Sequence, residues 1–219
     1  MEFERLLELV DDDPIFETTL LLAGKVDPHS VRLQLTRWTK SGRVYQLRRG
    51  LYALAPPYQK VKPHPFLIAN HMRRASYVSL QSALAFYGLI PETVQVTLSV
   101  TTGRPEQYET PLGAFEFRHV KPELLHGYRM TSLGEAISLR AGQQALIATP
   151  EKALLDLVYL HPGGEGPEYL HELRLQNLER LDIDALHCQA ESFATPKLHR
   201  AVAAITRLAQ NGTREYETL

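Results

Sequence analysis

Hydrophobic residues near the start of the chain recur at the spacing of amphipathic helices. Three segments show this pattern, and each is bounded by residues that begin or end helices. Asp13 and Asp27 each precede a proline, so a capping carboxylate stands before a residue whose missing N–H costs nothing at the first helical position. Gly24 and Gly42 follow two of the segments, where glycine commonly ends a helix. The pattern predicts helices over about 2–11, 14–23 and 28–41.

The next segment, GRVYQLRRGLYAL at 42–54, predicts a β-hairpin. VYQL and LYAL are rich in β-formers, and Gly50 between them can supply the positive φ of a tight turn. The order helix, helix, helix, strand, turn, strand is that of a winged helix-turn-helix. We therefore expect such a domain over residues 1–55. The stretch APPYQKVKPHP has four prolines in eleven residues and predicts a stiff linker over 56–66.

The longer second part alternates helical and strand-like patterns. It predicts an α+β chain in which a larger mixed α/β domain, at 67–210, ends in a helical C-terminal region. Capping residues stand before three of its predicted helices, at Ser79, Thr149 and Thr195. Residues 211–219 are predicted to form a flexible tail. We expect helices at about 65–75, 79–89, 150–160, 168–176, 182–192 and 196–210, and strands at 93–101, 113–120 and 136–148.

Charge is unevenly distributed, although the whole chain has a net charge of only −1. Residues 1–24 sum to −6, residues 25–62 to +8 and residues 63–219 to −3. A compact basic segment raises the local potential and attracts polyanions even when the chain is near neutral. Because this segment coincides with the third predicted helix and the hairpin, we expect nucleic acid to bind there.

One face of the third predicted helix is basic. At about 100° per residue, Val31, Leu35 and Trp38 form an apolar stripe that should face the domain core. The opposite face would enter the major groove, where arginine can hold guanine and threonine can touch a thymine methyl. Leu33 also falls on that face, against the pattern. Arginines at a wing tip suit phosphates or the minor groove. The predicted DNA-binding residues are Arg32, Thr36, Arg37, Lys40, Arg43, Arg48 and Arg49.

Sequence motifs of common enzymes are missing. The chain has no phosphate-binding or dinucleotide-binding glycine motif, its histidines lack ligand spacing, and Cys188 is its only cysteine. We therefore expect no enzymatic activity, metal or cofactor. In PEKALLD, Lys152 and Asp156 lie four residues apart and predict an ion pair on a helix surface. Together with Glu151 they are expected to stabilise a helix start or to line a functional surface.

The start of the chain and its longest apolar runs indicate where in the cell the protein is expected. The acidic start lacks the features of a signal peptide, and the apolar runs are far too short to span a bilayer. We therefore expect a cytoplasmic protein with no membrane partner.

Three stretches have a specific pattern: RGLY in the hairpin, YVSLQSALAFYGL at 77–89, and ATPEKALLDL within ALIATPEKALLDLVYL at 145–160. With the winged-helix pattern they resemble the AbiEi family of abortive-infection antitoxins over roughly residues 5–160. The resemblance implies a bacterial repressor that binds inverted repeats in its own promoter, and two copies on two half-sites would match such symmetry. It also implies that the second domain counters a nucleotidyltransferase-like toxin without a stable complex. By position, the DNA contacts it implies are Arg32, Arg37, Lys40, Arg43, Arg48 and Arg49.

Other functions fit parts of the pattern. A nuclease or nucleotidyltransferase docked by the winged helix would need a carboxylate cluster and a divalent metal. A winged helix that binds proteins predicts no affinity for DNA. An RNA-binding variant would prefer RNA hairpins to duplex DNA.

Overall fold

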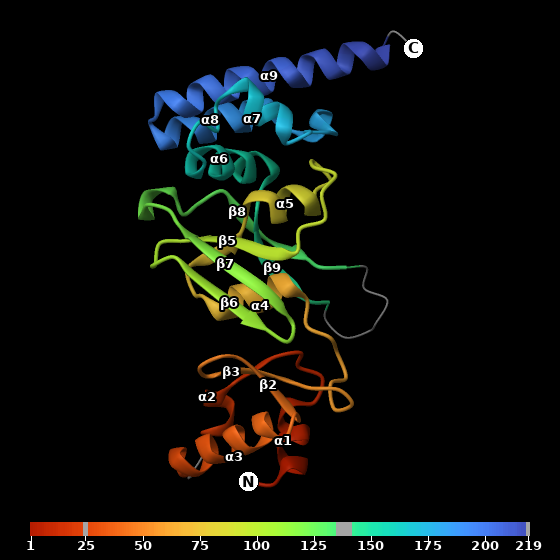
Figure 1. The fold of residues 1–219 in the computed structure, drawn as a ribbon, viewed down its shortest axis with the longest axis vertical. Helices are drawn as coiled ribbons and strands as arrows, with labels where there is room; N and C mark the ends of the chain where they lie inside the picture. The colour runs from red at the N-terminus through yellow and green to blue at the C-terminus, as the bar shows by residue number, and fades with distance from the viewer. Residues whose placement is uncertain (24–25, 135–141, 218–219) are drawn as a thin grey trace.

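The first 54 residues form one end of an elongated molecule, with helices packed on a small antiparallel sheet (Figure 1). The structure is a computed structural model that describes residues 1–23, 26–134 and 142–217, with side chains to residue 210. The sheet has the strand order β1-β3-β2. The elements are α1 (Phe3–Val10), β1 (Phe16–Glu17), α2 (Thr18–Leu21), α3 (Pro28–Lys40), β2 (Val44–Arg48) and β3 (Leu51–Leu54).

The helix predicted over 14–23 is wrong in its first part. Phe16 and Glu17 form β1 instead, because Phe16 pairs with Tyr52 of β3 and its ring stacks on the Tyr52 ring with centroids 5.8 Å apart. Only Thr18–Leu21 is helical. Strand pairing and ring packing with a distant segment thus outweigh the local helical signal. Gly24 lies outside the described residues.

The prediction of α3 is confirmed at both ends. The Asp27 carboxylate accepts hydrogen bonds from the backbone N–H groups of His29 and Ser30, at 3.2 and 2.9 Å. Gly42, just beyond the helix, has the positive φ of +71° that favours glycine. The hairpin is also confirmed, with Gly50 at φ +86° in its turn.

The hairpin packs on both of its faces. Tyr52 and Leu54 belong to the hydrophobic cluster formed with α1 and α3, whereas Leu47, Leu51 and Ala53 belong to the cluster of the second half of the chain. Every residue of β3 is therefore buried. The linker predicted over 56–66 has neither helix nor strand as far as residue 64, but its last two residues already belong to a helix, because Pro65 stands at the first helical position after the cap residue His64.

The second half contains a mixed sheet with helices on it (Figure 1). The described strands are arranged in the order β6-β7-β5-β4-β9-β8, with β5–β7 and β4–β9 parallel and the other neighbours antiparallel. The sequence pattern missed β4, β6 and β8. The elements are α4 (Pro65–Met72), β4 (Ser76–Val78), α5 (Leu80–Phe86), β5 (Val96–Thr101), β6 (Glu106–Thr110), β7 (Gly113–His119), η1 (Pro122–Leu124), β8 (Tyr128–Ser132) and β9 (Gln144–Ala148).

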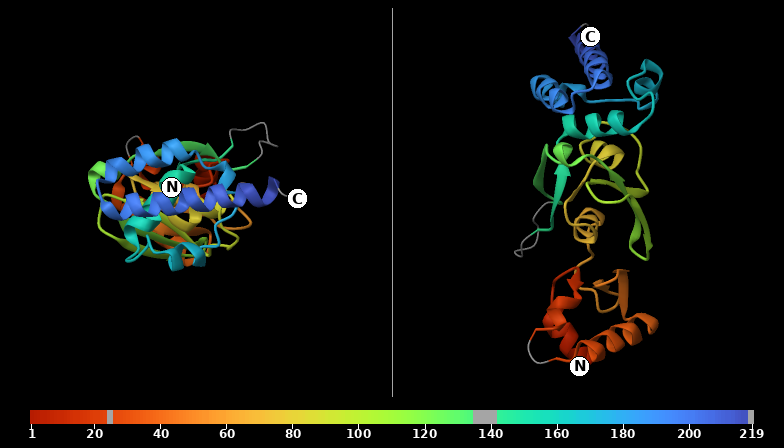
Figure 2. Two further views of the ribbon diagram at one scale, coloured as in Figure 1. Left: turned by 90° about the horizontal axis from the view of Figure 1, so that it is seen from above. Right: turned by 90° about the vertical axis from the view of Figure 1, so that its left-hand side faces the viewer.

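A helical layer forms the end of the molecule opposite the N-terminus (Figures 1 and 2). There α6 packs against α5, and α8 and α9 lie side by side over α6. The backbone of α9 continues to Glu217, so the tail predicted from residue 211 is helical as far as that residue. No helix among the described residues is long and apolar enough to cross a membrane. The elements are α6 (Pro150–Leu160), α7 (Pro167–Glu172), η2 (Leu178–Arg180), α8 (Ile183–Phe193) and α9 (Pro196–Glu217).

The chain is thus a mixed α/β protein. A strand was predicted over 136–148. Residues 136–141 lie outside the described residues, and β9 begins at Gln144.

Candidate functional site

The exposed face of α3 gathers most of the predicted DNA-binding side chains. Val31, Leu35 and Trp38 are buried against α1 and the small sheet, as the sequence predicts. The four residues predicted for the opposite face are all exposed, and none forms a salt bridge with another described residue. They are Arg32, Thr36, Arg37 and Lys40.

Two hairpin arginines also face solvent. Arg43 is exposed, and its guanidinium carbon lies 4.9 Å from the centroid of the Phe3 ring. Arg49 is exposed at the turn, beside Gly50. Arg43 lies where the chain passes from α3 into the hairpin, and its backbone N–H donates to the Trp38 carbonyl, whereas Arg49 lies at the other end of the hairpin.

Arg48 lies differently from its neighbour Arg49. Its side chain is only 26% exposed, and its Nη2 donates a hydrogen bond of 3.0 Å to the carbonyl of His71 in α4. Its Nη1 donates to the Arg49 carbonyl at 2.8 Å, and the Glu17 carboxylate is 4.0 Å away. The register of β2 on β3 shifts between Gln46 and Arg48, and such a bulge re-aims the side chain that follows it. The predicted arginine pair is therefore split, and Arg48 joins the hairpin to the second half.

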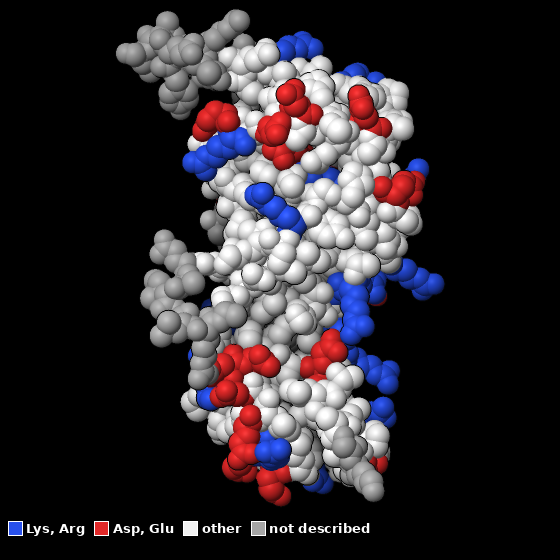
Figure 3. All heavy atoms as spheres, turned by 180° about the vertical axis from the view of Figure 1, so that it is seen from behind, with Lys and Arg blue, Asp and Glu red and all other residues white. Residues whose placement is uncertain are grey.

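Acidic residues from the start of the chain neutralise part of the basic segment. Lys60 pairs with Asp11 at 2.5 Å and with Asp12 at 3.6 Å, and Glu17 lies between Arg48 and Arg74. Figure 3 shows acidic side chains gathered on one side of the lower part, with Lys and Arg along the opposite edge. Within residues 26–62, the cations that form no ion pair with another described residue are mostly on α3 and the hairpin: Arg32, Arg37, Lys40, Arg43, Arg49 and Lys62.

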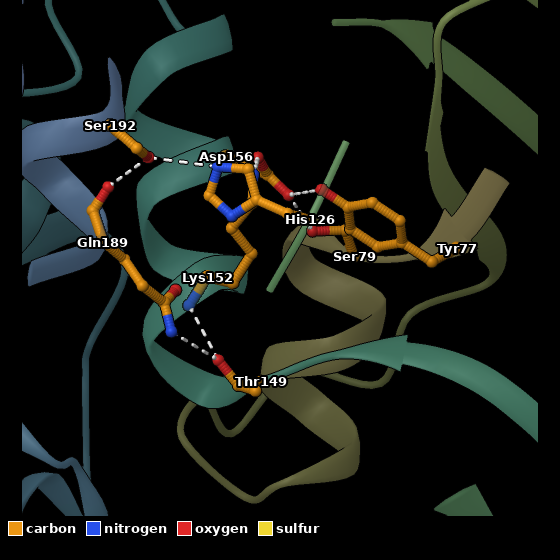
Figure 4. Close-up of polar contacts among 8 residues, drawn as sticks. All are labelled: Tyr77, Ser79, His126, Thr149, Lys152, Asp156, Gln189 and Ser192. Atoms are coloured by element: carbon orange, nitrogen blue, oxygen red, sulfur yellow. Dashed lines mark hydrogen bonds and ion pairs between the residues drawn. The ribbon is translucent and has the colours of Figure 1, made fainter. Parts of the chain in front are cut away.

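A second cluster of polar residues lies inside the molecule, on α6 (Figure 4). Lys152 and Asp156 form an ion pair whose two side chains are 0% exposed. The hydroxyls of Tyr77 and Ser79 both donate to Oδ2 of Asp156, at 3.0 and 2.8 Å, while the Lys152 ammonium contacts Oδ1. The prediction of a surface ion pair is wrong, because β9, α5, α8 and α9 surround α6.

Burial perturbs the titration of this cluster. It raises the pKa of the Asp156 carboxyl, while the Lys152 ammonium and the two hydroxyls oppose the rise. It lowers the pKa of the Lys152 ammonium, an effect that Asp156 opposes. Burial and the Asp156 charge also raise the pKa of Tyr77, so its hydroxyl stays protonated and able to donate.

Other side chains close the cluster from the α8 side. The Lys152 ammonium lies 4.5 Å from the centroid of the Phe193 ring, and a Cβ at Gly127 would come within 3.0 Å of the Lys152 side chain. His126 and Ser192 are 3.1 Å apart across the outer edge (Figure 4). The cluster is thus enclosed. In this conformation its polar groups bond to one another and are not open to a ligand.

Glu151 is also buried, so the predicted functional surface of Glu151, Lys152 and Asp156 does not exist in the structure. Its Oε1 accepts a hydrogen bond of 3.0 Å from the backbone N–H of Asp182. Sequence reasoning missed Tyr77 and Ser79 as partners of α6. The sequence predicts Ser79 as a helix cap, but its hydroxyl does not cap α5 and donates to Asp156 instead.

Comparison with known proteins adds no assignment to either site. No family model matches the chain, and no curated protein is significantly similar to it. Within the described ranges, no group of three or more His, Cys, Asp or Glu side chains is arranged to hold a metal ion. The two sites are therefore judged on their geometry, and only the α3 face is open to a ligand.

Proposed function

We propose that residues 1–55 are a winged helix-turn-helix that binds duplex DNA through α3. The observation that supports this most is the exposed basic face of α3, opposite its buried apolar stripe. The element order α1-β1-α2-α3-β2-β3 fits that domain type. In the proposal, α3 enters the major groove and the hairpin turn lies over the phosphate backbone.

The proposed roles follow from side-chain chemistry. The guanidinium of Arg32 or Arg37 can donate two hydrogen bonds to guanine, and Lys40 at the end of α3 can contact phosphate. The proposal assigns phosphate contacts to Arg43 and Arg49, which are both exposed. In this proposal Arg48 connects the hairpin to α4 instead of contacting DNA, because its Nη1 and Nη2 already donate to carbonyls of the chain.

We further propose that the protein is a repressor of the AbiEi type. The three stretches that resemble that family support the proposal, as does the basic segment. Binding to inverted repeats by two copies, action against a nucleotidyltransferase-like toxin without a stable complex, and a cytoplasmic location belong to the same proposal. It assigns the chain a binding role and no catalytic step.

Salt-dependent binding tests the DNA-binding proposal. We expect the purified chain to bind a duplex from its own upstream region more tightly than a scrambled duplex, with affinity falling steeply as salt rises. Removing two phosphate-contacting cations in Lys40→Ala/Arg49→Ala should reduce the slope of log K against log salt by about two. Fluorescence anisotropy over a salt series measures both quantities.

The matched control is Arg180→Ala/Arg200→Ala, which removes two exposed cations from the helical end of the molecule. It should leave the slope unchanged. Equal slopes for both double variants, or no duplex binding at moderate salt, would contradict the proposal. Cleavage of the duplex in the presence of Mg²⁺ would favour the enzyme alternative instead.

A further inference from the structure

Leu33 stands at the centre of the exposed face of α3. Its side chain is 44% exposed and belongs to neither hydrophobic cluster. At about 100° per residue, it lies opposite the buried stripe of Val31, Leu35 and Trp38. A large apolar side chain at the middle of a polar face has no role in the core, so a contact outside the chain would be needed to bury it.

The neighbours of Leu33 on this face show what kind of surface it belongs to. Thr36, Arg37 and Lys40 follow it at spacings of three, four and seven residues, which places all four side chains on one side of the helix. The Thr36 hydroxyl donates a hydrogen bond of 2.9 Å to the Arg32 carbonyl. Its O–H donor is therefore used within the helix, and its methyl group is available to a ligand.

The surface thus combines two apolar groups with a surround of positive charge. A protein partner that covered Leu33 would also have to neutralise Arg32, Arg37 and Lys40, none of which has an ion pair with a described residue. The DNA major groove meets both conditions, because phosphates line its edges and thymine methyl groups project into it. No other base presents a methyl group there.

We infer that Leu33, together with the Thr36 methyl, binds thymine 5-methyl groups in the major groove and so helps to set sequence preference. This rests on the proposed DNA-binding function, and it assigns the helix a base-reading group that carries no charge. Leu33 lies in the first half of α3, the part of a recognition helix that reaches base edges. Arg37 and Lys40 then fix the position of the helix on the duplex.

Removing single methyl groups from DNA tests the inference. Duplexes that the chain binds are selected from a random pool, and one is resynthesised with each thymine replaced in turn by deoxyuridine, which lacks only the 5-methyl group. At one or more positions we expect affinity to fall about fourfold, as for one buried methylene-sized group. In Leu33→Ala and Leu33→Gln, affinity for the original duplex should fall, and the deoxyuridine effect at those positions should disappear.

The matched control is Leu208→Ala, which trims a leucine of similar exposure, 41%, on α9. It should keep the full deoxyuridine effect. If no duplex is selected from the pool, the DNA-binding proposal fails and the inference with it. If a duplex is selected but no deoxyuridine substitution weakens binding, or Leu33→Ala retains the effect, only the inference is overturned. It is equally overturned if sedimentation shows that Leu33→Ala weakens binding by dissociating a dimer.

Discussion

The two charged side chains buried on α6 are held in place by their polar partners. Lys152 and Asp156 can lie in the core because they form an ion pair with each other. The hydroxyls of Tyr77 and Ser79 donate hydrogen bonds to the second carboxylate oxygen of Asp156. A buried ion pair of this kind contributes little net stability, yet losing one partner is costly because the other charge stays buried.

Asp156→Asn should therefore lower the free energy of unfolding by about 3–5 kcal/mol, since the Lys152 ammonium loses its counter-charge. Lys152→Met/Asp156→Asn should lose less, because no charge remains in the core and the amide oxygen still accepts from the hydroxyls. Urea unfolding at neutral pH measures both values. If Asp156→Asn is no less stable than the double variant, an unpaired Lys152 ammonium is not costly in this core and the prediction is wrong.

Helix starts are determined at the scale of the element, by residues next to it in the sequence. Thr149 accepts a hydrogen bond from the Lys152 N–H at the start of α6, and Asp27 caps α3 in the same way. At α4 the cap is a histidine: Nδ1 of His64 accepts from the Phe66 N–H at 3.1 Å. Burial lowers the pKa of His64, which keeps this acceptor unprotonated near neutral pH.

The cap of α4 predicts a pH dependence. Because the pKa of His64 is lower in the folded chain than in the unfolded chain, its contribution is present above the unfolded value of about 6.5 and is lost as pH falls through the folded value. Native protein should therefore lose more stability between pH 7 and pH 5 than His64→Asn, whose amide oxygen caps without titrating. Urea unfolding at several pH values compares them, and parallel pH profiles would exclude this role for His64.

At the scale of the whole molecule, the hairpin joins the two hydrophobic clusters. Leu47 and Leu51 pack into the second-half cluster, and Arg48 extends the contact by its bond to the His71 carbonyl. The DNA-binding part in our proposal is therefore attached to the rest of the chain through the same hairpin that presents Arg49.

This arrangement predicts different effects for two adjacent arginines. Arg48→Ala should lower the free energy of unfolding by about 1–3 kcal/mol, because it removes charged hydrogen bonds to two carbonyls. Arg49→Ala should change stability by less than about 0.5 kcal/mol and should weaken DNA binding. Thermal unfolding and fluorescence anisotropy with DNA test this on both variants. Equal effects on stability would contradict the different roles of Arg48 and Arg49.

The sequence by itself determined the features that depend on neighbouring residues. The Asp27 cap, the bounds of α3 and α6, the turn at Gly50 and the two faces of α3 follow from spacing and local backbone chemistry. Each of these features depends only on residues that are close together in the sequence, so the sequence pattern is enough to predict it. The exposure of Arg32, Thr36, Arg37 and Lys40 on α3 was predicted for the same reason.

Tertiary structure decided what depends on distant segments. The edge strands β6 and β8 were missed because an edge strand with mostly polar, partly exposed side chains lacks strong apolar alternation. Phe16 became a strand residue through pairing with Tyr52, and Arg48 turned inward through a bulge and the His71 carbonyl. The burial of Lys152 and Asp156 required helices on several sides of α6, and no spacing within PEKALLD specifies that enclosure.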